Sequence, residues 1–395
     1  MANLNGTGGD DVLDAGNGEN YNGSLYGGDG NDRLSGGPGW DRLYGGTGDD
    51  ILGDYRYMPD FGGSTEMYGG AGDDLLGIEV PGMETGFNAL LYGGSGDDRI
   101  YAGLSDYLTD VRYGSQAGVY GGVGNDEIRI YGIYADVFGE NGDDTITVLE
   151  NPGRVYGGAG DDRISLIAED GYTMEAVGGA GRDTITIVTT SLAKVDGGTE
   201  SDTATVTSYY ANVAGGSGND NLYVTAQLDA QVDGGYGADT IIVRSDTADI
   251  TGGADNDVIS VDAREASVDA GSGNDQVYVA AGRYAVTLGG GQDSLWLQGP
   301  TGHPGDTFVT VADFRTGNSG DTIKFNDVLR ASTDWEPGMG DPLASGHVRL
   351  LQQGADTLVQ VDEDGAGSTS GWDDLLLLDD VQRSLLNAHN LDFFT

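Results

Sequence analysis

Apolar and polar residues alternate with a period of two over most of the chain, in short segments separated by glycine-rich turns. Directly after a turn, apolar pairs such as Ile146 and Val148 flank a single polar residue. A second apolar column lies two residues before the next turn. It consists of Leu25, Leu43, Met67, Leu91, Val119, Val137, Val155, Ala176, Val195, Val213, Val232, Ile250, Val268 and Val286. This period and the many β-branched residues predict two short strands per repeat, and therefore an all-β solenoid.

The turns between these strands share the motif Gly-Gly-x-Gly-x-Asp, which returns at intervals of 18 residues or more up to residue 297. The flanking glycines vary, but we place an aspartate in all fifteen turns. These residues are Asp10, Asp32, Asp50, Asp74, Asp98, Asp126, Asp144, Asp162, Asp183, Asp202, Asp220, Asp239, Asp257, Asp275 and Asp293. One Gly-Asp turn alone would indicate only a good turn, whereas so many in register indicate a ligand.

The residues of this motif suit calcium, which binds six to eight oxygen atoms from carboxylates and backbone carbonyls. Glycine permits the positive φ angles that direct carbonyl groups inward, and one aspartate per turn adds charge. We therefore predict that stacked turns bind several Ca²⁺ ions, mainly along one edge. The glycines assigned to these sites are Gly28, Gly30, Gly46, Gly48, Gly70, Gly72, Gly94, Gly96, Gly122, Gly124, Gly158 and Gly160.

Some turns depart from this scheme. Near the N-terminus, 27–32, 36–41 and 45–50 are nine residues apart, so two nonapeptides form one coil and successive copies alternate edges. The second edge then offers only weak positions, at Asn20 and Asp41. Elsewhere Glu200 and Asp255 replace the fourth-position glycine, and Arg182 adds a cation beside Asp183. We expect calcium sites to be least regular in these turns.

The nonapeptide, with an apolar residue two positions after the aspartate, resembles the calcium-binding repeat of RTX proteins over roughly three quarters of the chain. The resemblance implies a right-handed parallel β-roll with calcium between successive turns. Residues 306–314 and 317–325 are similar to the segment that closes the roll in RTX exoproteins. Residues 347–367 and the tail 391–395 resemble the C-terminal region of type I secretion substrates. We therefore expect a roll over 1–297 and a β-rich capping and secretion region over 298–395.

Two groups of aromatic residues are candidates for partner binding. Between residues 53 and 120 the loops on the second edge are enlarged, and these loops either bind a partner or fold back over the roll. Their candidate residues are Tyr55, Tyr57, Phe61, Phe87 and Tyr107. An outward residue also follows each member of the apolar column in the first half. These residues are Tyr26, Tyr44, Tyr68, Tyr92, Tyr120, Phe138 and Tyr156.

Strands about 4.8 Å apart would stack these outward rings into a ladder. Such a ladder either binds a glycan or protein partner or stabilises the sheet by cross-strand stacking alone.

Composition restricts the class of protein further. The formal net charge of −47 disfavours nucleic acid and anionic membranes as partners. The absence of cysteine excludes disulfides and thiolate metal sites. The start of the chain, 1–6, lacks the features of a Sec-type signal, and no apolar run is long enough to span a membrane. We therefore expect no transmembrane segment and export by the type I secretion apparatus.

Known catalytic motifs are missing from the sequence. His303, His347 and His389 belong to no His-Glu-x-x-His motif, and neither Gly-x-Ser-x-Gly nor a P-loop occurs. The stretch 362–373 has some aspartates at EF-hand positions, but Ala366 and the missing final glutamate argue against that loop. We predict that the protein has no catalytic domain.

Together these patterns predict a secreted protein that stays unfolded where calcium is scarce and folds on binding calcium outside the cell. We expect it to act as a non-catalytic surface, matrix or adhesion protein. Two alternatives remain: a host-directed effector or membrane-active toxin, and an enzyme acting on extracellular polysaccharide.

Overall fold

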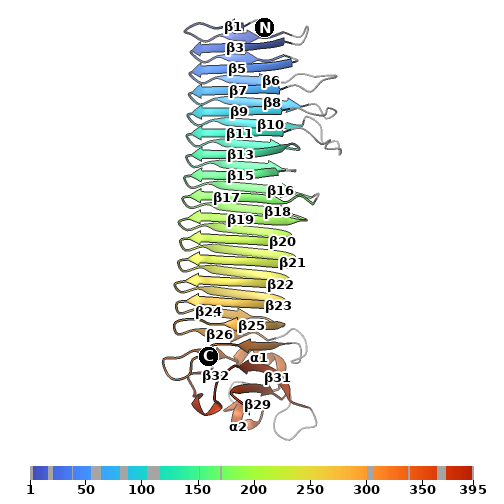
Figure 1. The fold of residues 1–395 in the computed structure, drawn as a ribbon, viewed down its shortest axis with the longest axis vertical. Coiled ribbons are helices and arrows are strands. Elements are labelled where there is room, and N and C mark those ends of the chain that lie inside the picture. The colour runs from blue at the N-terminus through green and yellow to red at the C-terminus, as the bar shows by residue number, and fades with distance from the viewer. Residues whose placement is uncertain are drawn as a thin grey trace. The chain divides into compact units, whose positions relative to one another are not determined.

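The structure is a computed structural model, which describes residues 3–16, 21–37, 39–54, 64–80, 88–104, 116–150, 152–169, 171–299, 307–336, 339–362 and 371–393. The chain divides into two compact units, Met1–Asp202 and Thr203–Thr395. Both units are built from parallel β-strands stacked in coils, which confirms the predicted parallel β-solenoid (Figure 1).

In the first unit, two rows of short strands stack in parallel. Strands of the first row run into the Gly-Asp turns: β1 (Asn3–Asn5), β3 (Tyr21–Asp29), β5 (Gly39–Thr47), β7 (Ser64–Ala71), β9 (Asn88–Ser95), β11 (Gln116–Val123), β13 (Tyr134–Asn141), β15 (Pro152–Ala159), β17 (Met174–Ala180) and β19 (Leu192–Thr199). Strands of the second row follow the turns: β2 (Val12–Asp14), β4 (Arg33–Ser35), β6 (Ile51–Asp54), β8 (Leu75–Val80), β10 (Arg99–Leu104), β12 (Glu127–Tyr131), β14 (Thr145–Leu149), β16 (Arg163–Ala168) and β18 (Thr184–Thr189).

Equivalent residues of successive coils lie side by side in this unit. Leu25 pairs with Leu43, which pairs with Met67, and the turn glycines remain in the same register. The predicted apolar column points inward, and its members are almost completely buried in both units. The alternation in the sequence therefore encodes the core directly, because in a strand every second side chain faces the same side.

The second unit begins with four long strands, β20 (Thr203–Ser217), β21 (Asn221–Tyr236), β22 (Thr240–Ala254) and β23 (Val258–Ser272), each of which contributes to both rows. Shorter strands continue the parallel stack. They are β24 (Gln276–Val279), β25 (Arg283–Thr287), β26 (Ser294–Leu297), β27 (Phe308–Val311) and β28 (Thr322–Lys324). The coil therefore extends past residue 297, where the sequence motif becomes irregular.

The C-terminal part of the second unit closes this stack. An antiparallel sheet is formed by β29 (Val348–Gln353), β30 (Asp356–Val361) and β31 (Asp373–Leu378), and β31 pairs in parallel with β27. The last strand, β32 (Leu391–Asp392), pairs with β28. The final coil thus ends against paired strands instead of an open edge.

The C-terminal part also contains short helices, which the sequence analysis did not predict. They are α1 (Asn326–Ser332), α2 (Pro342–Ser345) and the 3₁₀ turn η2 (Arg383–Leu385). Each is too short to show a helical period, although Asp341 before Pro342 is a recognisable start signal for α2.

The EF-hand-like stretch follows β30 and reaches the first residue of β31, and its residues 363–370 are outside the described part of the chain.

We predict that Leu91→Ala lowers the stability of the calcium-loaded protein by about 2–5 kcal/mol, because it removes buried methyl groups and leaves a cavity in the inward column. Leu90→Ala is the matched control, since the neighbouring side chain points outward and is only partly buried. Urea denaturation followed by circular dichroism measures both variants. Equal midpoints for the two variants would contradict the assigned column.

Candidate metal centre

The backbone of the Gly-Asp turns adopts the left-handed conformation that the motif predicts. The second- and fourth-position glycines have positive φ, for example 125° at Gly46 and 115° at Gly48. Where the motif departs, Glu200 and Asp255 still have φ of 76° and 77°. These two substitutions therefore keep the shape of the turn, at the cost of a conformation that L-residues disfavour.

The first glycine of each turn lies beside two oxygen atoms that come from different coils. A Cβ added at Gly45 would lie 2.3 Å from Asp50 Oδ2 and 2.5 Å from the carbonyl oxygen of Gly69 in the next turn. The same pair of contacts recurs through both units, for instance at Gly139 and at Gly234. A carboxylate oxygen and a carbonyl oxygen thus face one small space beside the first glycine, a position that Ala270 and Leu288 occupy in the turns of Asp275 and Asp293.

The turn aspartates form a buried ladder through their first carboxylate oxygen. The backbone N–H of Asp32 donates to Asp50 Oδ1 at 2.7 Å, and that of Asp50 donates to Asp74 Oδ1 at 2.8 Å. The second unit repeats this pattern, because Asp257 donates to Asp275 Oδ1 at 2.8 Å. Each hydrogen bond joins one coil to the next, so the aspartates fix the register of the stack.

The second oxygen of these carboxylates is buried without a hydrogen-bond partner. This holds for Oδ2 of Asp32, Asp50, Asp74, Asp98, Asp126, Asp144, Asp162, Asp183, Asp239, Asp257 and Asp275. Burying a charged oxygen without a partner is costly, and proteins rarely leave it so. A row of such atoms, each next to a backbone carbonyl, fits the oxygen ligands that Ca²⁺ requires.

Burial also raises the pKa values of these carboxyl groups. Loss of solvent is the largest cause, and the neighbouring aspartates add repulsion, so that the pKa of Asp74 rises to about 7 and that of Asp144 to about 8. Hydrogen bonds from the adjacent coil act in the opposite direction but are weaker. A bound cation would stabilise the ionised form of these groups.

Side chains alone do not complete a metal site. Within the described residues, no three acidic, histidine or cysteine side chains converge on one point. Calcium held here would therefore take much of its coordination from backbone carbonyls, which the glycine turns supply.

Comparison with known families agrees with this geometry. A family model described as the RTX calcium-binding nonapeptide repeat (4 copies) matches residues 3–21, 17–52, 85–106, 138–166 and 251–286. The chain carries RTX calcium-binding nonapeptide repeats in a parallel β-solenoid. No curated protein matches the chain. Among the described residues, no helix has the length and apolar character needed to cross a membrane.

The first RTX turn is shifted by one residue from the sequence prediction. Asp11, not Asp10, donates its N–H to Asp32 Oδ1 at 2.8 Å and so begins the buried ladder. Asp10 is exposed and accepts from the N–H of Asn31. The glycine pair 8–9 matched the motif in the wrong frame, because apolar Val12 follows Asp10 at the same spacing as Leu13 follows Asp11.

An outer ladder of aspartate and asparagine side chains runs beside the buried one. Its members immediately precede the column aspartates, and their hydrogen bonds point in the opposite direction, as from Asp73 N–H to Asp49 Oδ1 at 3.0 Å. Arg182 belongs to this exposed ladder and pairs with Asp161 Oδ2 at 2.7 Å. Asp183 keeps its place in the buried column, so the arginine does not point toward the candidate calcium position.

On the second edge, Asp41 is buried and accepts from the N–H of Gly37 at 2.8 Å. Asn20, the other weak position of that edge, lies outside the described residues.

In the second unit, the buried aspartate column has one further member that the sequence motif did not predict. Asp321 accepts from the N–H of Asp293 at 3.2 Å. Its turn is longer than the others, although the segment Gly320-Asp321-x-Ile323 preserves the end of the motif.

The outward aromatic residues of the first unit form the expected ladder. Neighbouring ring centroids from Tyr26 to Tyr156 are 4.6–5.0 Å apart, with planes inclined by 1–11°. The rings therefore cover each other's faces and present mainly their edges to solvent. Because sugars stack on ring faces, this geometry favours the structural interpretation.

The remaining candidate partner residues cannot be placed in the same way. Tyr55, Tyr57, Phe61, Phe87 and Tyr107 all lie outside the described residues.

We predict that the calcium-free protein gains stability on acidification from about pH 8 to about pH 5.5. The folded-state pKa values of the column are raised from 3.8 to between about 6 and about 8, so the folded state binds more protons than the unfolded chain. Stability is then highest below the unfolded pKa and is lost as pH rises through the folded values. Thermal melts in calcium-depleted buffer test this, and a melting point that rises with pH would contradict it.

We further predict that Asp144→Asn lowers calcium affinity by at least about tenfold at the adjoining turns, since it removes a ligand charge and loss of a supporting group alone costs about 10–100-fold. The matched control is Asp143→Asn, whose side chain belongs to the exposed ladder. Calorimetric titration with CaCl₂ compares the two variants. A larger loss of affinity in the control would place the ions on the outer ladder.

Proposed function

We propose that this RTX protein is exported as an unfolded chain and folds when calcium fills the buried aspartate column outside the cell. The observation that carries this proposal is the row of buried Oδ2 atoms without partners. In a cytosol poor in free calcium these carboxylates repel one another, which disfavours the stacked coils. At millimolar extracellular calcium, binding to the folded state alone shifts the equilibrium toward it.

RTX repeat proteins are typically secreted, and the resemblance of 347–367 and 391–395 to type I secretion substrates supports this route. In this proposal the region that follows the regular repeats has two roles. It is read by the secretion apparatus, and after export it closes the end of the roll. The pairing of β31 with β27 and of β32 with β28 supports the second role.

The folded rolls then act as a non-catalytic surface, matrix or adhesion protein. Regular hydrogen-bonded coils and stacked tyrosines favour a rigid scaffold over a catalytic cleft. An extracellular glycan or protein partner is part of this proposal.

One hydrogen-bonded group in the cap combines the residue types of a hydrolase triad. His347 Nδ1 lies 2.8 Å from Ser345 Oγ, and Nε2 lies 2.6 Å from Asp334 Oδ1. However, the Asp334 side chain is 66% exposed, whereas the acid of a triad is usually buried behind the imidazole. Ser345 also ends the short helix α2. We assign this group a structural role that ties α2 to the segment after α1.

We predict a cooperative change from coil to β-structure when calcium is added to chelated protein. Far-UV circular dichroism during the titration measures it, with magnesium as the control ion. Magnesium should not replace calcium, because it prefers a smaller octahedral site and gives up its water reluctantly. A full β spectrum under chelation at neutral pH would show that the apolar columns suffice for folding, and would contradict the proposal.

A further inference from the structure

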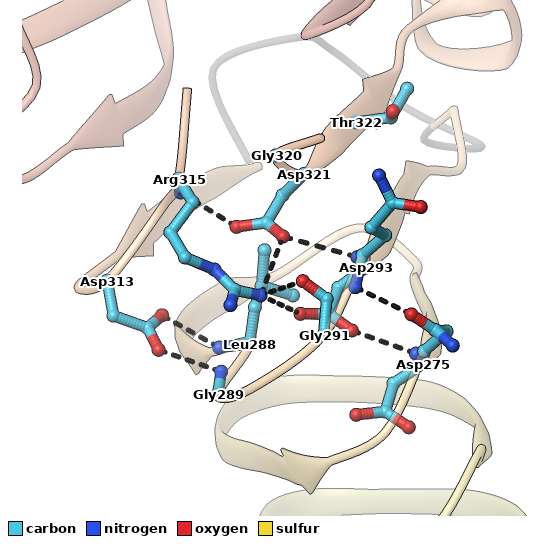
Figure 2. A network of polar contacts seen from close by, with 12 residues as sticks. Asp275, Leu288, Gly289, Gly291, Asp293, Asp313, Arg315, Gly320, Asp321 and Thr322 are labelled. Carbon is cyan, nitrogen blue, oxygen red and sulfur yellow. Dashed lines mark hydrogen bonds and ion pairs between the residues drawn. The ribbon is translucent and has the colours of Figure 1, made fainter. Parts of the chain in front are cut away.

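The last turn of the aspartate column contains an arginine where the earlier turns contain only oxygen ligands. Arg315 lies between β27 and β28, and its guanidinium points into the turn formed by Gly291 and Asp293 (Figure 2). Nη2 is 3.2 Å from Asp293 Oδ2 and 3.2 Å from Asp321 Oδ1, and it also donates to the carbonyl oxygen of Gly291. One nitrogen thus contacts two carboxylates and a backbone carbonyl.

The same oxygen atom has a different environment one coil earlier. Oδ2 of Asp275 and of Asp257 is buried without a partner, whereas Oδ2 of Asp293 pairs with the guanidinium. The ladder hydrogen bonds are otherwise alike, because Asp275 donates to Asp293 Oδ1 at 2.9 Å. The arginine therefore neutralises the atom that the other turns leave for an external cation.

The surrounding contacts fix this arginine in place. Its own backbone N–H donates to Asp321 Oδ2 at 2.7 Å, so both oxygens of Asp321 are paired within the turn. Nearby, Asp313 accepts from the backbone N–H groups of Leu288 and Gly289 at 2.8 and 2.7 Å. Figure 2 shows these contacts joining the two final turns of the column. The Arg315 side chain is 43% exposed, but its backbone N–H and its guanidinium both contact Asp321, which holds the positive charge in the turn.

Arginine is suited to this position by its chemistry. The guanidinium is charged at every accessible pH, is weakly hydrated, and presents several donors in a plane. Asp293 and Asp321 are 1% and 0% exposed, so removing the guanidinium would leave two buried carboxylates without their cation. A calcium ion at the same oxygens would have to displace this tethered cation.

We propose that Arg315 occupies the last cation position of the column, so that the gap between Asp293 and Asp321 excludes calcium. The final coil and the cap then hold together in the metal-free protein, while the preceding coils require calcium. This inference rests on the proposed calcium-dependent folding, and it adds that the dependence ends at a defined turn.

Hydrogen exchange of the full wild-type chain in chelator tests the first consequence. Amides of residues 288–297 and 308–324 should exchange about tenfold or more slowly than those of residues 240–258, because the former belong to the part held by Arg315. Equal exchange in the two parts would overturn the proposal.

Calcium stoichiometry tests the second consequence. At saturating calcium, Arg315→Met should bind about one ion more than wild type by equilibrium dialysis and elemental analysis, because the vacated oxygens match those of other turns. In chelator the variant should also lose the protection of residues 288–297 and 308–324. The matched control is Arg264→Met, whose guanidinium pairs with exposed Asp246 at 2.9 Å. An unchanged ion count in Arg315→Met would overturn the proposal.

If Arg315→Met fails to fold even with calcium, Arg315→Lys decides the question. It retains the positive charge and should show the wild-type ion count and protection, and loss of either would overturn the proposal. Failure of the underlying function gives a different result. In that case wild-type protein is folded throughout in chelator and binds no calcium, whatever residue stands at position 315.

Discussion

Aspartate carboxylates buried along one edge impose the main constraint on this fold. One oxygen of each carboxylate accepts a backbone N–H from the adjacent coil, and this sets the register. In the turns from Asp32 to Asp183 and from Asp239 to Asp275, the other oxygen is buried beside a carbonyl group and has no protein donor. Stacking thus brings like charges together at the spacing of neighbouring strands, and their repulsion opposes the packing of the apolar columns. The stability of such a fold therefore depends on the groups that occupy the aspartate column.

The other features of the coil follow from this requirement. Glycine is favoured at the second position because a Cβ at Gly46 would lie 2.1 Å from the carbonyl oxygen of Gly28, although Glu140 occupies this position in its turn with φ of 80°. The apolar column supplies burial on the inner side, and the stacked tyrosines add cross-strand contacts on the outer side of the first unit. At the end of the second unit, strands β31 and β32 pair with the last coil, and Arg315 supplies the positive charge there.

Most of the column and the core could be predicted from the sequence because both lie at fixed offsets from the glycine turn, although the interval between turns varies. It failed where spacing alone was ambiguous. Asp10 was chosen in place of Asp11 because two frames of the glycine motif overlap, and only the hydrogen bond from Asp11 to Asp32 separates them. Asp321 was missed because its turn is enlarged. The directions of the Arg182 and Arg315 side chains follow from tertiary contacts that no repeat motif contains. The helices of the cap were missed because they are shorter than any detectable period.

We place the cations at the buried oxygens and not at the exposed acidic ladder. Anomalous diffraction from crystals of the calcium-loaded protein tests this most directly. We expect calcium peaks about 2.3–2.6 Å from the buried Oδ2 atoms and the adjacent turn carbonyls, the usual range for calcium–oxygen ligands. We expect no peak between Asp293 and Asp321. Peaks confined to the outer ladder of Asp49, Asp73 and Asp97, with an empty buried column, would contradict it.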